Sequence, residues 1–207
     1  MEKWLGLDSK FYKWGTLLAD LIIITVLWLI CSLPLITIGA STTAIYYITT
    51  RQLSNREGYV TRDFWKSFKA NFIQGTIVTV IFILILTIVG INISILDRTT
   101  LLGTCLFYIQ FVVLYEVIIV GIYIFPILSR FELKIFELFK TAIFMANRHL
   151  LTTITAIAVL IALCLIVLRV PILIFLCTGV YAILTSLMFM SLFKKYVPTI
   201  DTDSENM

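Results

Sequence analysis

The chain has 207 residues, of which 60% are hydrophobic and 14% are charged, against about 25% charged residues in soluble domains. The formal net charge of +4 is modest. The positively charged residues lie between the apolar runs. A basic rim that faces anionic lipid therefore explains the net positive charge better than nucleic-acid binding does. About 20 apolar residues suffice to cross the hydrocarbon of a bilayer, and several uncharged runs reach that length. We therefore expect an all-α, polytopic transmembrane helix bundle, formed as a single integral membrane domain over residues 1–207.

The first 16 residues are predicted to form an interfacial anchor helix. Trp4, Leu7, Phe11 and Trp14 recur at helical spacing and make one aromatic face, as in helices that lie in the membrane interface. The first predicted span follows, from about Leu17 to Ile36.

The next segment, Thr37–Thr50, is ambiguous. It ends an uncharged run of thirty residues that starts at Leu21. As one helix this run would measure about 45 Å, too long for a hydrocarbon core of about 30 Å, yet it is too short for two full spans. Pro34 and Gly39 should break the helix. We predict that Thr37–Thr50 is half-embedded or interfacial, which gives five spans; a tight sixth span is the alternative.

Two basic connections, Arg51–Ala70 and Ser129–Arg148, are predicted to contain amphipathic helices lying on the membrane. The apolar face of the first comprises Phe64, Trp65, Phe68 and Phe72, and that of the second comprises Phe131, Ile135, Leu138 and Phe139. Spans 2 to 5 are predicted at Phe72–Leu96, Leu101–Leu128 (broken by Glu116 and ending at Pro126), Leu150–Leu168 and Ile172–Phe193.

The orientation follows from the distribution of positive charge. The two connections and the tail, 194–207, hold eleven of the sixteen lysines and arginines. They are therefore predicted to face the cytoplasm, with the N-terminus outside for five spans and inside for six.

An internal repeat relates Phe68–Ile81 to Phe144–Ile157 and aligns Asn71 with Asn147. It predicts a first unit at 17–96, a second unit of the same orientation at 101–168, and a last span at 171–193. Two interpretations of the asparagines stay open: they bond locally at the ends of helices, or they face each other across a cleft.

Glu116 is the one acid deep within a predicted span. Acids inside membranes are candidates for function, and Glu116 shares a side of its helix with Tyr115. Glu116 is predicted to point into the bundle, toward Tyr or Asn partners from spans 1, 2 or 4. It either lines a substrate or proton path or is a protonated residue that holds helices together. Asp20, near the edge of span 1, is expected to be solvated or paired with a basic group. The candidate functional residues are Glu116, Asn71, Asn147, Tyr115 and Asp20.

No pattern typical of an enzyme or a metal site is present. The four cysteines form no C-x-x-C pair and sit in apolar runs, where they act as small apolar residues. His149 is the only histidine, whereas a metal site needs three or four ligands. Nucleotide-binding and hydrolase motifs are missing. We expect no catalytic activity and no cofactor.

Two blocks, Ser32–Tyr47 (SLPLITIGASTTAIYY) and Glu57–Phe72 (EGYVTRDFWKSFKANF), resemble the signature of the YesL-like family of bacterial integral membrane proteins, a domain of unknown function. The resemblance implies a multi-pass protein of the bacterial cytoplasmic membrane, the cell membrane. Members are often encoded beside carbohydrate ABC-transporter genes, and no catalytic residue is established among them.

Two functions are therefore weighed. The first is an accessory or scaffolding protein associated with carbohydrate ABC transport, with the permease subunits as possible partners. The second is a small transporter or channel that uses Glu116 and forms a homo-oligomer. A transporter should have a water-filled path lined by Glu116 and the two asparagines, whereas an accessory protein can have a closed core.

Overall fold

The computed structural model describes residues 10–53, 59–96, 99–193 and 196, with the backbone alone for residues 10–14. Every regular element within these residues is helical, as predicted. Most of the predicted anchor (1–16) and tail (194–207) lies outside the described residues. The long helices are α2 (Lys10–Cys31), α3 (Ile38–Leu53), α4 (Val60–Ala70), α5 (Phe72–Ile95), α6 (Leu101–Leu128), α7 (Ile135–Arg148), α8 (Leu150–Arg169) and α9 (Ile174–Phe193). Two short 3₁₀ turns, Leu35–Thr37 and Pro171–Leu173, precede α3 and α9.

Four helices are long and apolar enough to cross a membrane: α5, α6, α8, and α9 together with its preceding turn. They correspond to predicted spans 2 to 5. The described part of α2 contributes a shorter apolar stretch, Gly15–Cys31. The total of five or six spans stays a prediction.

The first predicted span ends earlier than expected, at Cys31 rather than Ile36. Pro34 explains the difference, because the residue before a proline is disfavoured in α-helical geometry. The hydroxyl of Thr37 donates to the carbonyl oxygens of Cys31 (2.5 Å) and Pro34 (2.7 Å), so backbone groups freed at the break are satisfied inside the protein. At its other end α2 begins at Lys10 and is continuous with the span. Residues 10–16 of the predicted anchor are therefore helical, and its place at the membrane interface stays a prediction.

Helix α3 is the central helix of the molecule. It packs against α2, α4, α5, α6 and α9, and most of its side chains are buried. This enclosure by neighbouring helices was not expected for Thr37–Thr50, and its half-embedded or interfacial position in the membrane stays a prediction. With 16 residues, α3 is about 24 Å long, short of the hydrocarbon thickness of about 30 Å. It is an internal helix and not a full lipid-exposed span.

Part of the apolar face of each amphipathic helix, α4 and α7, packs against the protein. Phe64 of α4 is fully buried against α2 and α3, and Leu138, Ala142 and Met145 of α7 are buried in the main core. The predicted helices exist and residues on their apolar faces contact the protein core. That the helices also lie on the membrane stays a prediction. On α4, Trp65 remains exposed.

Helix α6 runs without interruption through Glu116 and past Pro126, so the predicted break at Glu116 is wrong. Proline lacks the backbone N–H that would donate to the carbonyl four residues earlier in a helix. Pro126 lies in the last turn of α6, where the helix ends at Leu128 within the buried core.

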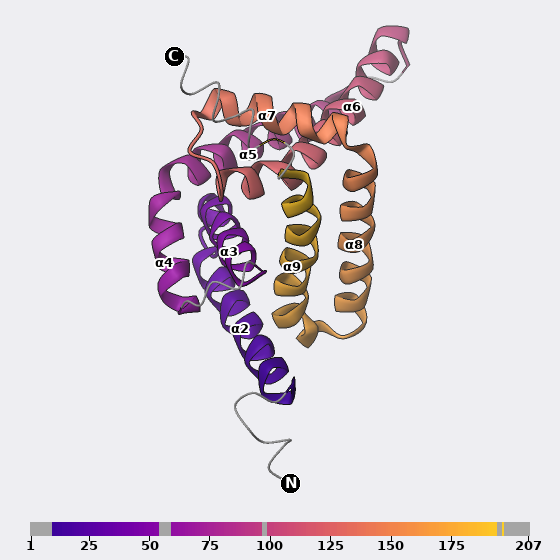
Figure 1. The fold of residues 1–207 in the computed structure, drawn as a ribbon. Helices are drawn as coiled ribbons and strands as arrows, with labels where there is room; N and C mark the ends of the chain where they lie inside the picture. The colour runs from indigo at the N-terminus through magenta and orange to yellow at the C-terminus, as the bar shows by residue number, and fades with distance from the viewer. Residues whose placement is uncertain (1–9, 54–58, 97–98, 194–195, 197–207) are drawn as a thin grey trace.

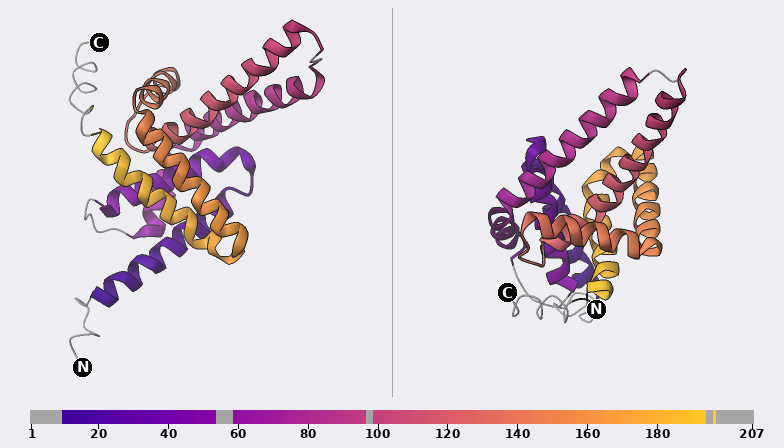
Figure 2. Two further views of the ribbon diagram at one scale, coloured as in Figure 1. Left: turned by 90° about the vertical axis from the view of Figure 1, so that its right-hand side faces the viewer. Right: turned by 90° about the horizontal axis from the view of Figure 1, so that it is seen from above.

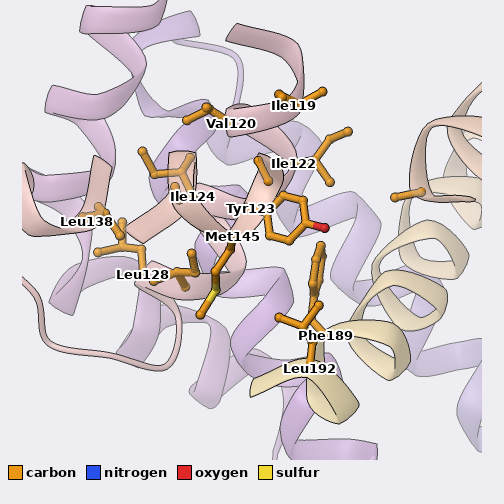
Figure 3. Close-up of a cluster of buried hydrophobic side chains, with 14 of the residues drawn as sticks. Ile119, Val120, Ile122, Tyr123, Ile124, Leu128, Leu138, Met145, Phe189 and Leu192 are labelled. Atoms are coloured by element: carbon orange, nitrogen blue, oxygen red, sulfur yellow. The ribbon is translucent and has the colours of Figure 1, made fainter. Parts of the chain in front are cut away.

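Two helical hairpins, α5–α6 and α8–α9, extend in different directions from a common core (Figures 1 and 2). Helix α7 lies across the ends of α8 and α9 (Figure 1). Figure 3 shows the core where these parts meet, with the rings of Tyr123 and Phe189 edge-on at 4.9 Å. Most buried residues of α5 lie in its first half and most of those of α6 in its second half. The distal part of this hairpin therefore presents apolar side chains outward.

The helix–corner–helix arrangement predicted by the repeat occurs twice, at α4–α5 and α7–α8. The corners fall at Asn71 and His149. Asn147 lies two residues earlier, inside the last turn of α7. The aligned asparagines therefore do not occupy equivalent positions.

Candidate functional site

The buried interface between α3 and α9 is lined by hydroxyl groups. Tyr46 Oη lies 3.2 Å from Thr185 Oγ1, and Thr49 Oγ1 lies 2.8 Å from Ser186 Oγ. All four residues are at most 5% exposed. Burying a hydroxyl is unfavourable unless it finds a hydrogen-bond partner, so these pairs fix how α3 and α9 face each other.

A second set of polar pairs joins α3 to α2. The indole Nε1 of Trp28 donates to Thr42 Oγ1 at 3.1 Å, and the hydroxyls of Ser32 and Ser41 lie 2.6 Å apart. These pairs hold α2 against α3 across the break at Pro34, so the chain turns back on itself with its polar groups satisfied.

The third contact, between α3 and α5, brings two backbones together at Gly39 and Gly75. The N–H of Gly39 donates to Thr79 Oγ1 (3.0 Å), and the Thr79 hydroxyl donates to the carbonyl of Gly75 (2.8 Å). A Cβ atom on Gly75 would lie 2.7 Å from the Ala40 nitrogen. Only glycine allows this approach, which resembles the small-residue packing of membrane helices.

The contacts of α3 leave few buried polar groups without a partner. Among the described residues, Thr76 Oγ1 is the one buried side-chain oxygen or nitrogen without a hydrogen-bond partner. The residues that make these contacts were not singled out as site candidates from the sequence. Their signal was the density of serine and threonine in the Ser32–Tyr47 block.

At the other end of α3, polar side chains connect it to α4 and α2. Arg51 Nη1 lies 2.8 Å from Asp63 Oδ1, and the Gln52 amide donates to Asp20 Oδ2 at 3.1 Å. Asp20 is half-buried. Its observed partner is thus a neutral amide rather than the basic group expected. The ion pair of Asp63 was not predicted from the sequence.

The Arg51–Asp63 pair is expected to couple α3 to α4 by about 1 kcal/mol, because it is only partly shielded from solvent and exposed pairs contribute at most about that much. A double-mutant cycle with Arg51→Gln and Asp63→Asn, read by unfolding in detergent, measures this coupling. Strict additivity of the two substitutions would contradict the expected interaction.

Glu116 bonds to Asn147, so the structure brings two of the predicted candidates together. Asn147 Nδ2 donates to Glu116 Oε2 at 3.3 Å and to the carbonyl of Ile143 at 3.1 Å. The partner is an asparagine, as predicted, but it comes from α7 and not from a span. Because Asn147 is exposed, the pair lies at the surface and not inside the bundle as expected. Tyr115, the neighbour of Glu116, is exposed at the surface.

Asn71 does not join this pair. Its amide donates to the carbonyl of Ser67, 3.0 Å away in the preceding turn of α4. Both asparagines thus bond the carbonyl four residues earlier, and neither bonds the other. This geometry favours the local interpretation over asparagines that face each other across a cleft.

A further polar cluster gathers at the α7–α8 corner. Tyr123 Oη lies 3.0 Å from Thr153 Oγ1, and His149 Nε2 lies 2.7 Å from Tyr196 Oη. The cluster ties α6, α8 and Tyr196, three residues beyond the end of α9, to one corner. Across the described part of the chain, no three His, Cys, Asp or Glu side chains are placed to hold a metal ion.

The apolar helices and the internally paired polar groups define a polytopic membrane protein built around a buried, hydroxyl-rich helix. Residues 21–93, from α2 through α5, match the family model described as "Protein of unknown function, DUF624". This match confirms the resemblance to the YesL-like family, which carries that domain. Searches of curated proteins and of solved structures gave no match.

Proposed function

We propose that this membrane protein is an accessory or scaffolding component that acts with a carbohydrate ABC transporter in the bacterial cytoplasmic membrane. The observation that carries the proposal is the packing of α3 at the centre. Its hydroxyls pair with Ser32, just after α2, and with Ser186 of α9, and the Gly39 N–H donates to Thr79 of α5. A protein that scaffolds needs a rigid interior and free outer surfaces, not a path through its centre. The association with ABC transport rests on the family resemblance, and we propose no catalytic activity.

Co-purification of the tagged full chain from native membranes, followed by mass spectrometry, tests this role. We expect subunits of a carbohydrate ABC permease to be enriched over a tagged, unrelated multi-pass protein expressed at the same level. Equal recovery of permease subunits with both tagged proteins would contradict the proposal.

A small transporter or channel, active as a homo-oligomer, is the second candidate. The Glu116–Asn147 pair favours it, because a carboxyl within an apolar helix is held beside a polar partner. Proteoliposomes containing the purified chain should then show solute or proton flux that Glu116→Gln abolishes, whereas the accessory role predicts no flux from either protein.

The two roles of Glu116 also differ in stability. If Glu116 holds α6 against α7, Glu116→Gln should be nearly neutral, because an amide oxygen still accepts the bond from Asn147. Glu116→Leu should destabilise the fold by about 1 kcal/mol, the usual net contribution of one hydrogen bond. Melting temperatures of the three proteins in one detergent measure this, and a leucine variant as stable as the wild type would contradict a holding role.

A further inference from the structure

The outer side of α4 carries a compact positive surface. Arg62, Lys66 and Lys69 are all exposed, and their spacing of four and three residues places them on one side of the helix. Asp63, the only acid of α4, is buried and paired with Arg51. The basic face of α4, defined as Arg62, Lys66 and Lys69, therefore has no acid on its own helix to neutralise it.

This basic face adjoins an apolar surface. Helix α4 ends at Ala70, and α5 begins at Phe72, where Phe72 and Ile73 are 41% and 72% exposed. The apolar helix α5 continues from there. Trp65, 44% exposed, lies beside the cations, and tryptophan is enriched where bilayer and water meet. A cationic layer directly against an apolar layer matches the boundary between lipid phosphates and acyl chains.

We propose that the basic face of α4 binds the phosphate headgroups of anionic phospholipids. The cations attract the phosphates, and each one near an anionic surface raises affinity roughly fivefold. Trp65 and Phe72 contact the adjoining lipid. This site is independent of whether the protein acts with a transporter.

Helix α7 provides a matched comparison. Its exposed cations Lys140 and Arg148 are eight residues apart, about 12 Å along the helix, and the Arg148 guanidinium lies over the Phe144 ring at 5.4 Å. Two cations at that separation do not share one phosphate. Removing them changes the net charge as much as removing Lys66 and Lys69 does, but leaves the basic face of α4 intact.

Native mass spectrometry of the purified full chain, with phosphatidylglycerol and phosphatidylcholine in detergent, tests the site. We expect Lys66→Gln with Lys69→Gln to lower phosphatidylglycerol retention roughly tenfold to thirtyfold, from two cations at about fivefold each. Phosphatidylcholine retention should not change. Lys140→Gln with Arg148→Gln should stay within twofold of the wild type, and Lys66→Arg with Lys69→Arg should retain the lipid.

Equal losses from the α4 and α7 pairs would show that retention follows net charge, and would overturn the site. Unchanged retention in the α4 pair would overturn it as well. If the α4 double variant has a lowered melting temperature, phosphatidylglycerol retention by the wild type is measured at increasing salt instead. Screening weakens exposed charge pairs, so retention should fall. Retention that does not depend on salt would refute the proposal. A photo-crosslinker at position 65 should label lipid in native membranes, and labelling of a protein instead would reassign the face to a protein partner.

Discussion

Replacing Gly75 with alanine is expected to destabilise the protein by roughly 2 kcal/mol or more. The new Cβ would lie 2.7 Å from the nitrogen and 2.8 Å from the Cα of Ala40. These are backbone atoms of α3, so no side chain can rotate away, and α3 and α5 must separate. Overpacking of a filled core typically costs about 1 to 3 kcal/mol. Thermal unfolding and size-exclusion profiles in detergent measure the loss.

Gly90, on the same helix, is the matched control. A Cβ atom built there meets nothing within 4 Å. Gly90→Ala should be neutral or stabilising by up to about 1 kcal/mol, because alanine favours the helix over glycine. If the Gly75→Ala and Gly90→Ala variants had the same melting temperature, the close approach of α3 to α5 would be contradicted. The comparison holds helix propensity constant and isolates the contact.

The apolar helices were predictable because length and hydropathy alone decide whether a segment can span a bilayer. The predicted spans at Phe72–Leu96 and Leu101–Leu128 differ from α5 and α6 by at most one residue. Short polar connections bound these helices and leave few alternatives.

The position of α3 was not predictable from the same quantities. An uncharged helix that faces lipid and one that faces protein have similar hydropathy. The two kinds of helix differ in the hydrogen-bond partners that their polar groups find. Ser41, Thr43 and Thr49 are fully buried. Their hydroxyls can bond carbonyls of their own helix, so even this density of hydroxyl residues did not require neighbouring helices.

The burial of Phe64 and Leu138 against the protein was not predictable for a related reason. Amphipathicity shows that one face avoids water, but not whether lipid or protein covers it. For Glu116, the type of partner followed from chemistry, since an amide can bond a carboxyl in either protonation state. The element that supplies Asn147 depended on how α7 folds back along α6, which is a long-range feature.

Phe64→Ala is expected to have the largest effect of any single substitution in α4, a loss of roughly 3 to 5 kcal/mol. Phe64 is fully buried and packs in the cluster that joins α4 to α2 and α3. Its ring also stacks on Phe68 at a centroid distance of 6.0 Å. Truncation leaves a cavity between three helices that cannot collapse without moving α4.

Trp65→Ala is the control, because Trp65 directly follows Phe64 in α4 but is 44% exposed. It should cost about 1 kcal/mol or less, chiefly through its edge-on contacts with Phe64 and Phe68. Melting temperatures in one detergent rank the two variants. If α4 lay with its aromatic face in lipid, Phe64 and Trp65 would face the same solvent and their truncation would cost similar amounts. A clear excess for Phe64 therefore shows that Phe64 faces the protein interior whereas Trp65 faces outward, and equal losses would contradict the burial of Phe64.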